Sequence, residues 1–420
     1  LIHKPPNYLQ VAMTCAGYRE KFGWDEAGMC DRIAKTLFSV MKDGSSSGYM
    51  DEEPPYGRFD RYSLLVGSEM SDNLMELGRE MPEFAKNNLQ KAAEFCLFAA
   101  NRRGDGINYG RSLSCHGDGA SAEILSSALA RGYLPENSEG TALAYILRVV
   151  EKILTVWYDQ KRGMFNIWLD GRATNGYRGI VRLLEVNADM AVHLLTVFHN
   201  LEVAGLADTA PTAVIPSPAA WQVKEEVFLD TPDRHLETVL LRRGDLSLML
   251  PLVGPGSWYD KTAYQPFPTL CGVLEAAPEA TYPYFVPEYT VADGRRLRPV
   301  QYFRRVEVSA GDDVVTVLAE GTLAVMGGHT PTDSGIPFRT VYTFRGTTAS
   351  ARFTTEAVGT ATMVTGRLAA TGDITVYGFD RAETLDTTGA EYHALTGPIV
   401  SATQYTADLV AECGYTVSLA

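Results

Sequence analysis

The stretch Ala210-Pro211-Thr212-Ala213-Val214-Ile215-Pro216-Ser217-Pro218 divides the sequence into two parts of different character. Its three prolines cannot continue a helix, and such a segment is typical of a linker or an extended crossing. Before it, apolar residues recur at helical spacing. After it, the sequence is rich in Val and Thr, and its only lysines are Lys224 and Lys261. The sequence therefore predicts an α-helical domain over residues 1–208 and a β domain over residues 209–420.

The first part shows the periodicity of amphipathic helices. In Leu89–Arg102, the residues Ala93, Cys96, Leu97 and Ala100 follow the spacing i, i+3, i+4 and i+7, which places them on one helix face. Serial helices joined by glycine-rich turns predict an incomplete α/α toroid, with an irregular helical bundle as the alternative. The other predicted helices are Ser121–Arg131, Thr141–Trp157 and Ala188–Leu201.

The second part shows the alternation of half-buried strands. Phe338, Thr340, Tyr342 and Phe344 alternate with the side chains of the opposite face. Because no helical crossovers separate the short strands, we expect an antiparallel β-sandwich rather than a parallel sheet. Further predicted strands are Leu246–Leu252, Val300–Val308, Val314–Leu318 and Ile374–Tyr377.

Composition narrows the class of protein. The chain has 420 residues, 45% of them hydrophobic, which at roughly 150 residues per domain suits two or three folded domains. A net charge of −14 without a basic patch argues against a nucleic-acid partner.

No apolar stretch reaches the ~20 residues of a membrane span, and the first residues contain neither an initiator Met nor a signal-peptide core. We expect a trimmed or processed soluble form. Its six dispersed cysteines should be mostly small buried apolar residues.

The densest polar cluster is the glycine-rich loop from Asp105 to Asp118, between two predicted helices. Elimination from a uronic acid needs a base, an acid and a positive partner for the carboxylate. Tyr109 and His116 can serve as base and acid, while Arg111 and Asn108 can bind the carboxylate. Alternatively, the segment is an ordinary turn in which Arg111 pairs with a neighbouring helix and His116 caps one.

Two further loop-to-helix junctions are candidate substrate-binding sites. Arg61 and Tyr62 can bind sugar, whereas Asp60 suits a helix N-cap, so a purely structural role is equally open. Tyr177 belongs to the second junction, together with Asn187. The amide of Asn187 either neutralises the substrate carboxylate or caps its helix.

Aromatic residues in the β part and histidines in the helical part allow two readings each. Trp258 and Tyr264 can stack on sugar rings or fill the seam between the domains. His193 lies among apolar residues of its helix, where a histidine is more often part of the core. His193 and His199 are about 240° apart around a helix and cannot bind one metal together. We therefore predict no metal and no cofactor.

Two short motifs carry a resemblance to known families. Arg58-Phe59-Asp60-Arg61-Tyr62 and Gly110-Arg111-Ser112-Leu113-Ser114-Cys115-His116 resemble the Phe-Asp-Tyr-Tyr and Gly-Arg-Ser-Leu-Thr-Tyr-Arg phrases of an uncharacterised bacterial toroid domain family, over roughly residues 7 to 206. The whole pattern is similar to the α/α-toroid plus β-sandwich polysaccharide lyases of heparinase II, alginate and hyaluronate lyase type. The resemblance implies a Tyr/His acid–base set with Asn/Arg carboxylate neutralisers. Tyr109, Arg111, His116 and Asn187 can take these parts, although Cys115-His116 replaces Tyr-Arg.

We therefore predict a secreted or periplasmic polysaccharide lyase that cleaves a uronic-acid-containing polysaccharide by β-elimination, with oligomers possible. The rival enzyme is a glycoside hydrolase, which needs two nearby carboxyl groups. Its candidates are Asp60, Asp105, Asp118 and Asp189. The non-enzymatic rival is a glycan-binding protein that uses Trp258 and Tyr264.

Overall fold

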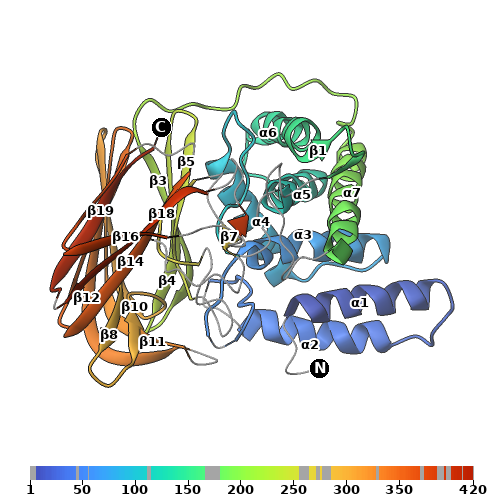
Figure 1. The fold of residues 1–420 in the computed structure, drawn as a ribbon. Helices are drawn as coiled ribbons and strands as arrows, with labels where there is room; N and C mark the ends of the chain where they lie inside the picture. Colours follow the sequence, from blue (N-terminus) through green and yellow to red (C-terminus); the bar gives the residue numbers. More distant parts are fainter. Residues whose placement is uncertain are drawn as a thin grey trace.

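The computed structural model describes most of the chain. The described residues are 6–43, 47–54, 56–110, 115–165, 180–254, 264–270, 275–276, 285–327, 331–368, 373–385, 392–393, 399–408 and 410–419. Within them, helices come first and antiparallel strands follow, so the α-then-β order predicted from the sequence is confirmed (Figure 1). The toroid and the sandwich stay predictions.

Seven α-helices occur among the described residues of the first half. Their bounds are α1 (Pro6–Lys21), α2 (Met29–Asp43), α3 (Arg61–Glu76), α4 (Glu83–Ala99), α5 (Cys115–Arg131), α6 (Glu139–Lys152) and α7 (Ile180–Val203). A π-helical turn, Ile153–Trp157, follows α6, and the short strands β1 (Tyr158–Asp159) and β2 (Met164–Phe165) form a hairpin. Each of the four predicted helices corresponds to one of these; the predicted end at Arg131 is that of α5, and the other ends are displaced by two or more residues.

Helix α5 lies at the centre of the helical half. It packs against α3, α4, α6 and α7, and most of its side chains are buried. Its first half is rich in Gly, Ala and Ser, and small residues let neighbouring helices approach closely. Gly119 illustrates this, because an added Cβ would lie 2.9 Å from the ring of His193 on α7. The composition of α5 therefore decides which side chains of α7 it meets.

The second half consists of antiparallel strands. They are β3 (Gln222–Asp230), β4 (His235–Arg243), β5 (Leu246–Leu252), β6 (Thr269–Leu270), β7 (Glu275–Ala276), β8 (Glu288–Val291), β9 (Arg296–Arg298), β10 (Phe303–Ala310), β11 (Val314–Met326), β12 (Thr332–Arg345), β13 (Thr348–Thr355), β14 (Gly359–Leu368), β15 (Ile374–Tyr377), β16 (Arg381–Leu385), β17 (Tyr392–His393), β18 (Ile399–Asp408) and β19 (Glu412–Ser418).

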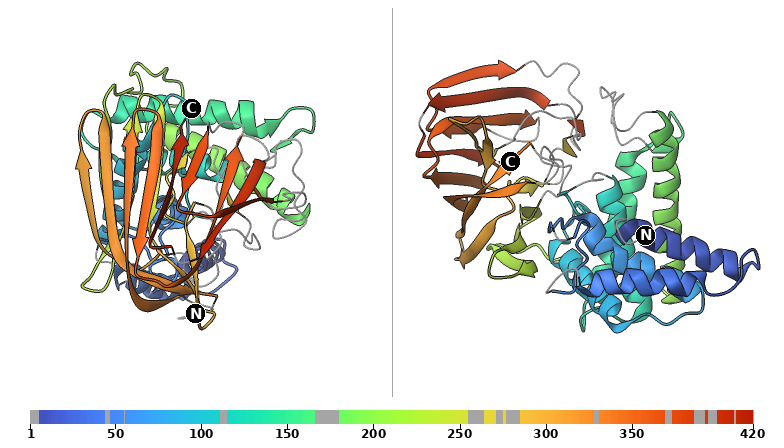
Figure 2. Two further views of the ribbon diagram at one scale, coloured as in Figure 1. Left: turned by 60° about the vertical axis from the view of Figure 1, so that its left-hand side comes forward. Right: turned by 90° about the horizontal axis from the view of Figure 1, so that it is seen from below.

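Among the described residues, these strands form one large curled sheet, a four-stranded sheet and a two-stranded pairing of β7 with β17. In the described chain the large sheet has 11 strands in the order β15-β19-β13-β12-β11-β9-β8-β14-β18-β16, with β10 beside β11. A four-stranded sheet, β3-β4-β5-β6, lies between it and the helices (Figures 1 and 2). All interior residues of β4 are buried, because one face meets the helical half and the other meets the large sheet.

The chain crosses from α7 to β3 through a segment without helix or strand. The crossing runs from residue 204 to residue 221 and contains the predicted boundary at 208/209 (Figure 1). Arg242 on β4 donates to the Pro216 carbonyl, and the buried ring of Trp221 packs against Phe344. Contacts from β4 and β12 therefore fix the path of the proline-rich stretch.

Aromatic rings and hydrogen bonds join the two halves. Phe228 on β3 stacks on Phe59 at 5.0 Å between centroids and meets Tyr49 edge-on at 4.9 Å. The Tyr49 hydroxyl donates to Glu226 at 2.7 Å. Helices and strands consequently share one continuous core.

Two sequence expectations concern the chain as a whole. In the described part, Cys30, Cys96, Cys115 and Cys413 are buried free thiols and Cys15 is an exposed one, which confirms mostly buried cysteines there. None of the described helices combines the length and the apolar character that crossing a membrane requires.

Candidate active site among helices α3, α5 and α7

The glycine-rich loop favoured by the sequence is tightly packed. A Cβ on Gly117 would lie only 2.0 Å from the carbonyl oxygen of Ile107, so no larger residue fits there. The Ile107 amide donates to the Gly117 carbonyl at 3.3 Å. The glycines of this loop therefore permit close backbone contact rather than an open cleft. Arg111 lies outside the described residues.

Asp118 anchors this loop to the helices. Its carboxylate accepts hydrogen bonds from the Gly106 amide at 2.8 Å and from Trp157 Nε1 at 2.8 Å, and Lys152 Nζ lies 2.9 Å away. Burial raises the pKa of Asp118 despite the opposing charge of Lys152. Two hydrogen bonds and one ion pair already engage this buried carboxylate. The geometry therefore gives Asp118 a structural role instead of the predicted contact with substrate.

Tyr109 is buried rather than presented to a substrate. None of its surface is exposed, and its phenol lies near Thr238 of β4, Asp60 and Glu226. Burial raises the pKa of Tyr109 well above its usual range, which disfavours the phenolate needed for proton abstraction. This placement is a correction to the predicted acid–base role, and the reason is that Tyr109 belongs to the seam between the two halves.

Asp60 and Tyr264 meet in the same seam. The Tyr264 hydroxyl donates to Asp60 Oδ2, and neither residue has exposed surface. Asp60 is also the N-cap of α3, where Oδ1 accepts the Tyr62 amide at 2.8 Å. Of the two roles left open by the sequence, the structural one fits both residues, because a sugar ring cannot reach a buried Tyr264.

The predicted amides also lie away from solvent or bind backbone. Asn187 Oδ1 accepts the Phe165 amide at 2.7 Å, and Nδ2 donates to the Phe165 carbonyl at 3.5 Å. The side chain therefore holds β2 against α7 instead of capping its helix. Asn108 is buried. Tyr177 and Trp258 lie outside the described residues.

Four of the candidate residues come together at the starts of α3 and α5 and on α7. Nδ1 of His116 lies 2.7 Å from Oδ2 of Asp189, and Arg61 Nη1 donates to the His116 carbonyl at 3.1 Å. Arg61 is hydrogen bonded to the Tyr62 side chain, and its guanidinium lies 4.4 Å from the centre of that ring. His116 and Arg61 are buried, Tyr62 is partly exposed and Asp189 is exposed.

A second histidine extends this group. Nδ1 of His193 lies 2.6 Å from Oε2 of Glu123, and Nε2 of His193 lies 3.9 Å from Oδ2 of Asp189. Burial opposes ionisation of Asp189, but the hydrogen bond and charge of His116 outweigh it and hold the pKa of Asp189 well below its usual range. His193 is therefore a buried polar group of the site, not a core residue among apolar neighbours.

Sequence reasoning missed Glu123 and the link between the two histidines. His116 and Glu123 are seven residues apart on α5, and Asp189 and His193 are four apart on α7, so each pair lies on one helix face. This spacing was a usable signal. However, nothing in the sequence indicates that the two faces oppose each other.

A cavity of about 370 Å³ adjoins the group. It lies between α1, α3, α5 and α7 and is strongly acidic. Burial, reinforced by the charge of Glu123, raises the pKa of Glu69 to about 8 and that of Asp72 to about 7. Tyr62 lies two helical turns from Glu69 on α3, on the same face. The acidic side chains of the lining are Glu69, Asp72, Glu76, Glu123 and Asp189.

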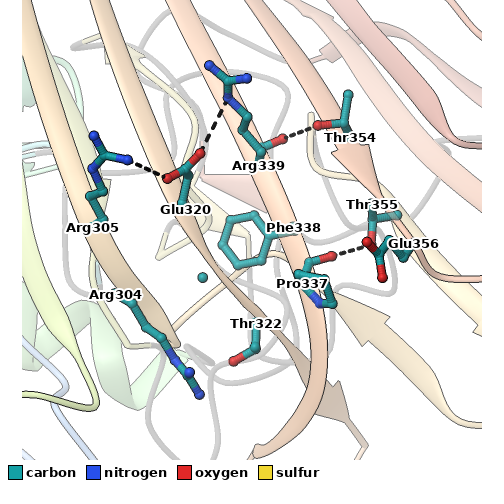
Figure 3. Close-up of a pocket in the computed structure, with 11 residues that line it drawn as sticks. Arg304, Arg305, Glu320, Thr322, Pro337, Phe338, Arg339, Thr354, Thr355 and Glu356 are labelled. Carbon is teal, nitrogen blue, oxygen red and sulfur yellow. Dashed lines mark hydrogen bonds and ion pairs between the residues drawn. The ribbon is translucent and has the colours of Figure 1, made fainter.

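A larger, shallow hollow of about 580 Å³ lies on the sheet formed by β10 to β13. Its arginines are paired within the sheet: Glu320 lies 3.2 Å from Arg305 and 3.5 Å from Arg339 (Figure 3). Arg304 pairs with Asp333 at 3.0 Å. Because acidic partners balance these cations, the hollow has fewer charged groups available to a ligand than the helical cavity.

Comparison with solved structures gives polysaccharide lyases as structural neighbours. A heparan sulfate lyase of Pedobacter heparinus, in a mutant form, matches 92% of this chain and 62% of its own, with 8% identity and a TM-score of 0.28. The Streptomyces coelicolor chondroitin AC lyase in complex with chondroitin sulphate matches 100% of this chain and 60% of its own, with 13% identity and a TM-score of 0.36. An α-L-rhamnosidase of Dictyoglumus thermophilum matches 92% of this chain and 43% of its own, with 9% identity and a TM-score of 0.23.

The chain thus spans about three fifths of the length of the two lyases. No protein-family model matches the sequence. The comparison with curated proteins also found no match.

Proposed function

We propose that this chain acts as a polysaccharide lyase that cleaves a uronic-acid-containing polysaccharide by β-elimination. The observation that carries the proposal is the arrangement at the starts of α3 and α5. There, a partly exposed phenol, Tyr62, is hydrogen bonded to the guanidinium of Arg61. Arg61 in turn is hydrogen bonded to the backbone of His116, whose ring pairs with Asp189.

Tyr62 is the group that moves the proton. The Arg61 guanidinium, hydrogen bonded to Tyr62, holds the phenol in place beside the substrate. Tyr62 then removes the C5 proton of the uronic acid, a double bond forms between C4 and C5, and the C4–O bond breaks. The same phenol returns the proton to the leaving oxygen, so the enzyme ends in its starting state. Tyr62 thus takes the acid–base part that was predicted for Tyr109.

The substrate carboxylate needs a positive partner while charge develops. Arg61 supplies positive charge beside Tyr62, and Arg111 stays a predicted second partner. Substrate must then lie at the end of the acidic cavity nearest Tyr62, since Glu76, two turns beyond Glu69 on α3, repels a uronate.

The direct test is product chemistry. Incubation with uronic-acid polymers should produce unsaturated uronates, detected by their ultraviolet absorbance and by mass spectrometry. If no polymer from a panel of glycosaminoglycans, alginate and pectate yields an unsaturated end, the lyase assignment is withdrawn.

A glycoside hydrolase is the second candidate, and the carboxylates of the cavity favour it. Hydrolysis needs one protonated and one ionised carboxyl group. Glu69, with its pKa raised to about 8 by burial, suits the acid, and Asp189, ionised beside His116, suits the base. Release of reducing ends without an unsaturated product would favour this reaction over elimination.

A further inference from the structure

Three side chains of types that commonly bind metal ions meet between α5 and α7. They are His116, in the first turn of α5, and Asp189 and His193, one turn apart on α7. One ligand atom from each lies within 4.8 Å of the other two. Zn²⁺ binds imidazole nitrogen and carboxylate oxygen at about 2.0–2.2 Å, so tetrahedral ligands lie roughly 3.3–3.5 Å apart. Small side-chain adjustments bring the three groups to that spacing.

His193 is oriented as a metal-binding histidine is. Glu123 lies 2.6 Å from Nδ1 and accepts the proton there, so a metal ion would bind through Nε2 in place of its proton. Nε2 is buried and has no hydrogen-bond partner among the described residues, and Oδ2 of Asp189 is 3.9 Å away. Only 4% of His193 is exposed. A buried polar atom without a partner costs free energy, which a bound ion would offset.

The surroundings allow an ion to enter and favour it electrostatically. Asp189 and His193 line the 370 Å³ cavity, and 48% of the Asp189 side chain is exposed. Glu76 and Glu123 in that cavity attract a cation, and Glu69 and Asp72 add to this attraction only above their raised pKa values of about 8 and 7.

We propose that His116, Asp189 and His193 form a binding site for a divalent transition-metal ion, with Glu123 holding the ring of His193 in place. Two imidazole nitrogens and one carboxylate oxygen select Zn²⁺ over Ca²⁺ and Mg²⁺, which prefer oxygen ligands. Three protein ligands leave a position open toward the cavity. This replaces the expectation of no metal, which considered only His193 with His199.

The site also deepens the proposed function, and this part rests on it. A uronate entering the acidic cavity meets mostly like charges, and a divalent ion next to Arg61 reverses that balance locally. The open position then binds the substrate carboxylate while Tyr62 moves the proton. Binding of the ion itself does not depend on the reaction.

The test measures metal binding without substrate. Full-length protein without a histidine tag is treated with a chelator, and Zn²⁺ is titrated by calorimetry, with metal analysis after dialysis. We expect one ion per chain that neither Ca²⁺ nor Mg²⁺ displaces. His193→Gln and Asp189→Asn should each weaken binding at least tenfold, and Glu123→Gln should weaken it about 10- to 100-fold.

Two matched variants control for other zinc sites. His199→Gln alters an exposed histidine of the same helix, and Cys15→Ser removes an exposed thiol that lines the cavity. Both should bind as the parent protein does. Circular dichroism checks the fold, and if His193→Gln fails to fold, Asp189→Asn and Glu123→Gln decide the question.

The site would be overturned if the parent protein did not bind Zn²⁺. It would also be overturned if His193→Gln, Asp189→Asn and Glu123→Gln all bound Zn²⁺ as tightly as the parent, or if only Cys15→Ser abolished binding. Zinc binding together with failure to cleave any uronate polymer would refute the lyase assignment alone. Lyase activity without zinc binding would refute the metal site alone.

Discussion

The imidazole of His116 pairs with the carboxylate of Asp189, with 2.7 Å between Nδ1 and Oδ2. This contact ties the first turn of α5 to α7, two helices from distant parts of the sequence. Through the backbone of His116 it also reaches Arg61 and hence Tyr62. A residue from the loop favoured by the sequence therefore does belong to the candidate site, but its partners come from other helices.

Replacing the phenol of Tyr62 should distinguish it from Tyr109. If an acidic polymer is eliminated, Tyr62→Phe should lower kcat by about 100-fold or more, since it removes the proton-transfer group. Tyr109→Phe should leave kcat within a few fold, because Tyr109 is buried in the seam. Initial rates of unsaturated product measure both. The reverse pattern would return the base to Tyr109.

Gly117→Ala should destabilise the protein. The new Cβ would lie 2.0 Å from the Ile107 carbonyl oxygen, so the loop and the start of α5 must separate. Overpacking of this kind costs about 1–3 kcal/mol of unfolding free energy. Gly311→Ala is the control, because its Cβ would meet nothing closer than 3.6 Å. Urea unfolding curves compare the two, and equal midpoints would contradict the packing argument.

Tyr264→Phe should weaken the seam between the halves. It removes the hydroxyl that donates to the buried Asp60, and loss of such a bond costs about 1–3 kcal/mol. Tyr8→Phe, at an exposed position on α1, should change stability little. Thermal unfolding followed by circular dichroism measures the difference. If Tyr264 instead stacks on sugar, its replacement would weaken glycan binding and leave the unfolding temperature unchanged.

Stability should fall at alkaline pH through His235. Its ring contacts Glu237 at 3.0 Å and Asp230 at 3.1 Å, and the bond to Glu237 chiefly raises the pKa of His235 to about 9 against the effect of burial. In the unfolded chain the pKa returns to about 6.5.

Because the folded pKa is the higher one, the stabilisation is complete below about pH 6.5, declines above it and is lost once the pH passes about 9. It amounts to roughly 1–3 kcal/mol. His235→Gln should remove this part of the pH dependence of unfolding free energy. The exposed His199→Gln should retain it. Identical pH profiles for parent and His235→Gln would refute the role of His235.

Local patterns in the sequence were sufficient for the four helices and five strands that it predicted, but not for the other elements of the described chain. The periodicity of Leu89–Arg102 and the alternation around Phe338 each correspond to an observed element, because both depend on which face of a single helix or strand is buried. The helix ends were less accurate. The helix expected to start at Ser121 begins at Cys115, since close packing of Gly117 against Ile107 supports a first turn that propensity alone does not favour.

The sequence by itself determined the order of helices and strands, the crossing around Pro216 and the residue types available for chemistry. Only the tertiary structure decided which of them meet. It buried Tyr109, Asp60 and Tyr264 in one seam and brought His116, Asp189 and His193 together. The physical reason is that periodicity fixes which face of a helix is buried, whereas the partner of that face depends on how distant helices pack.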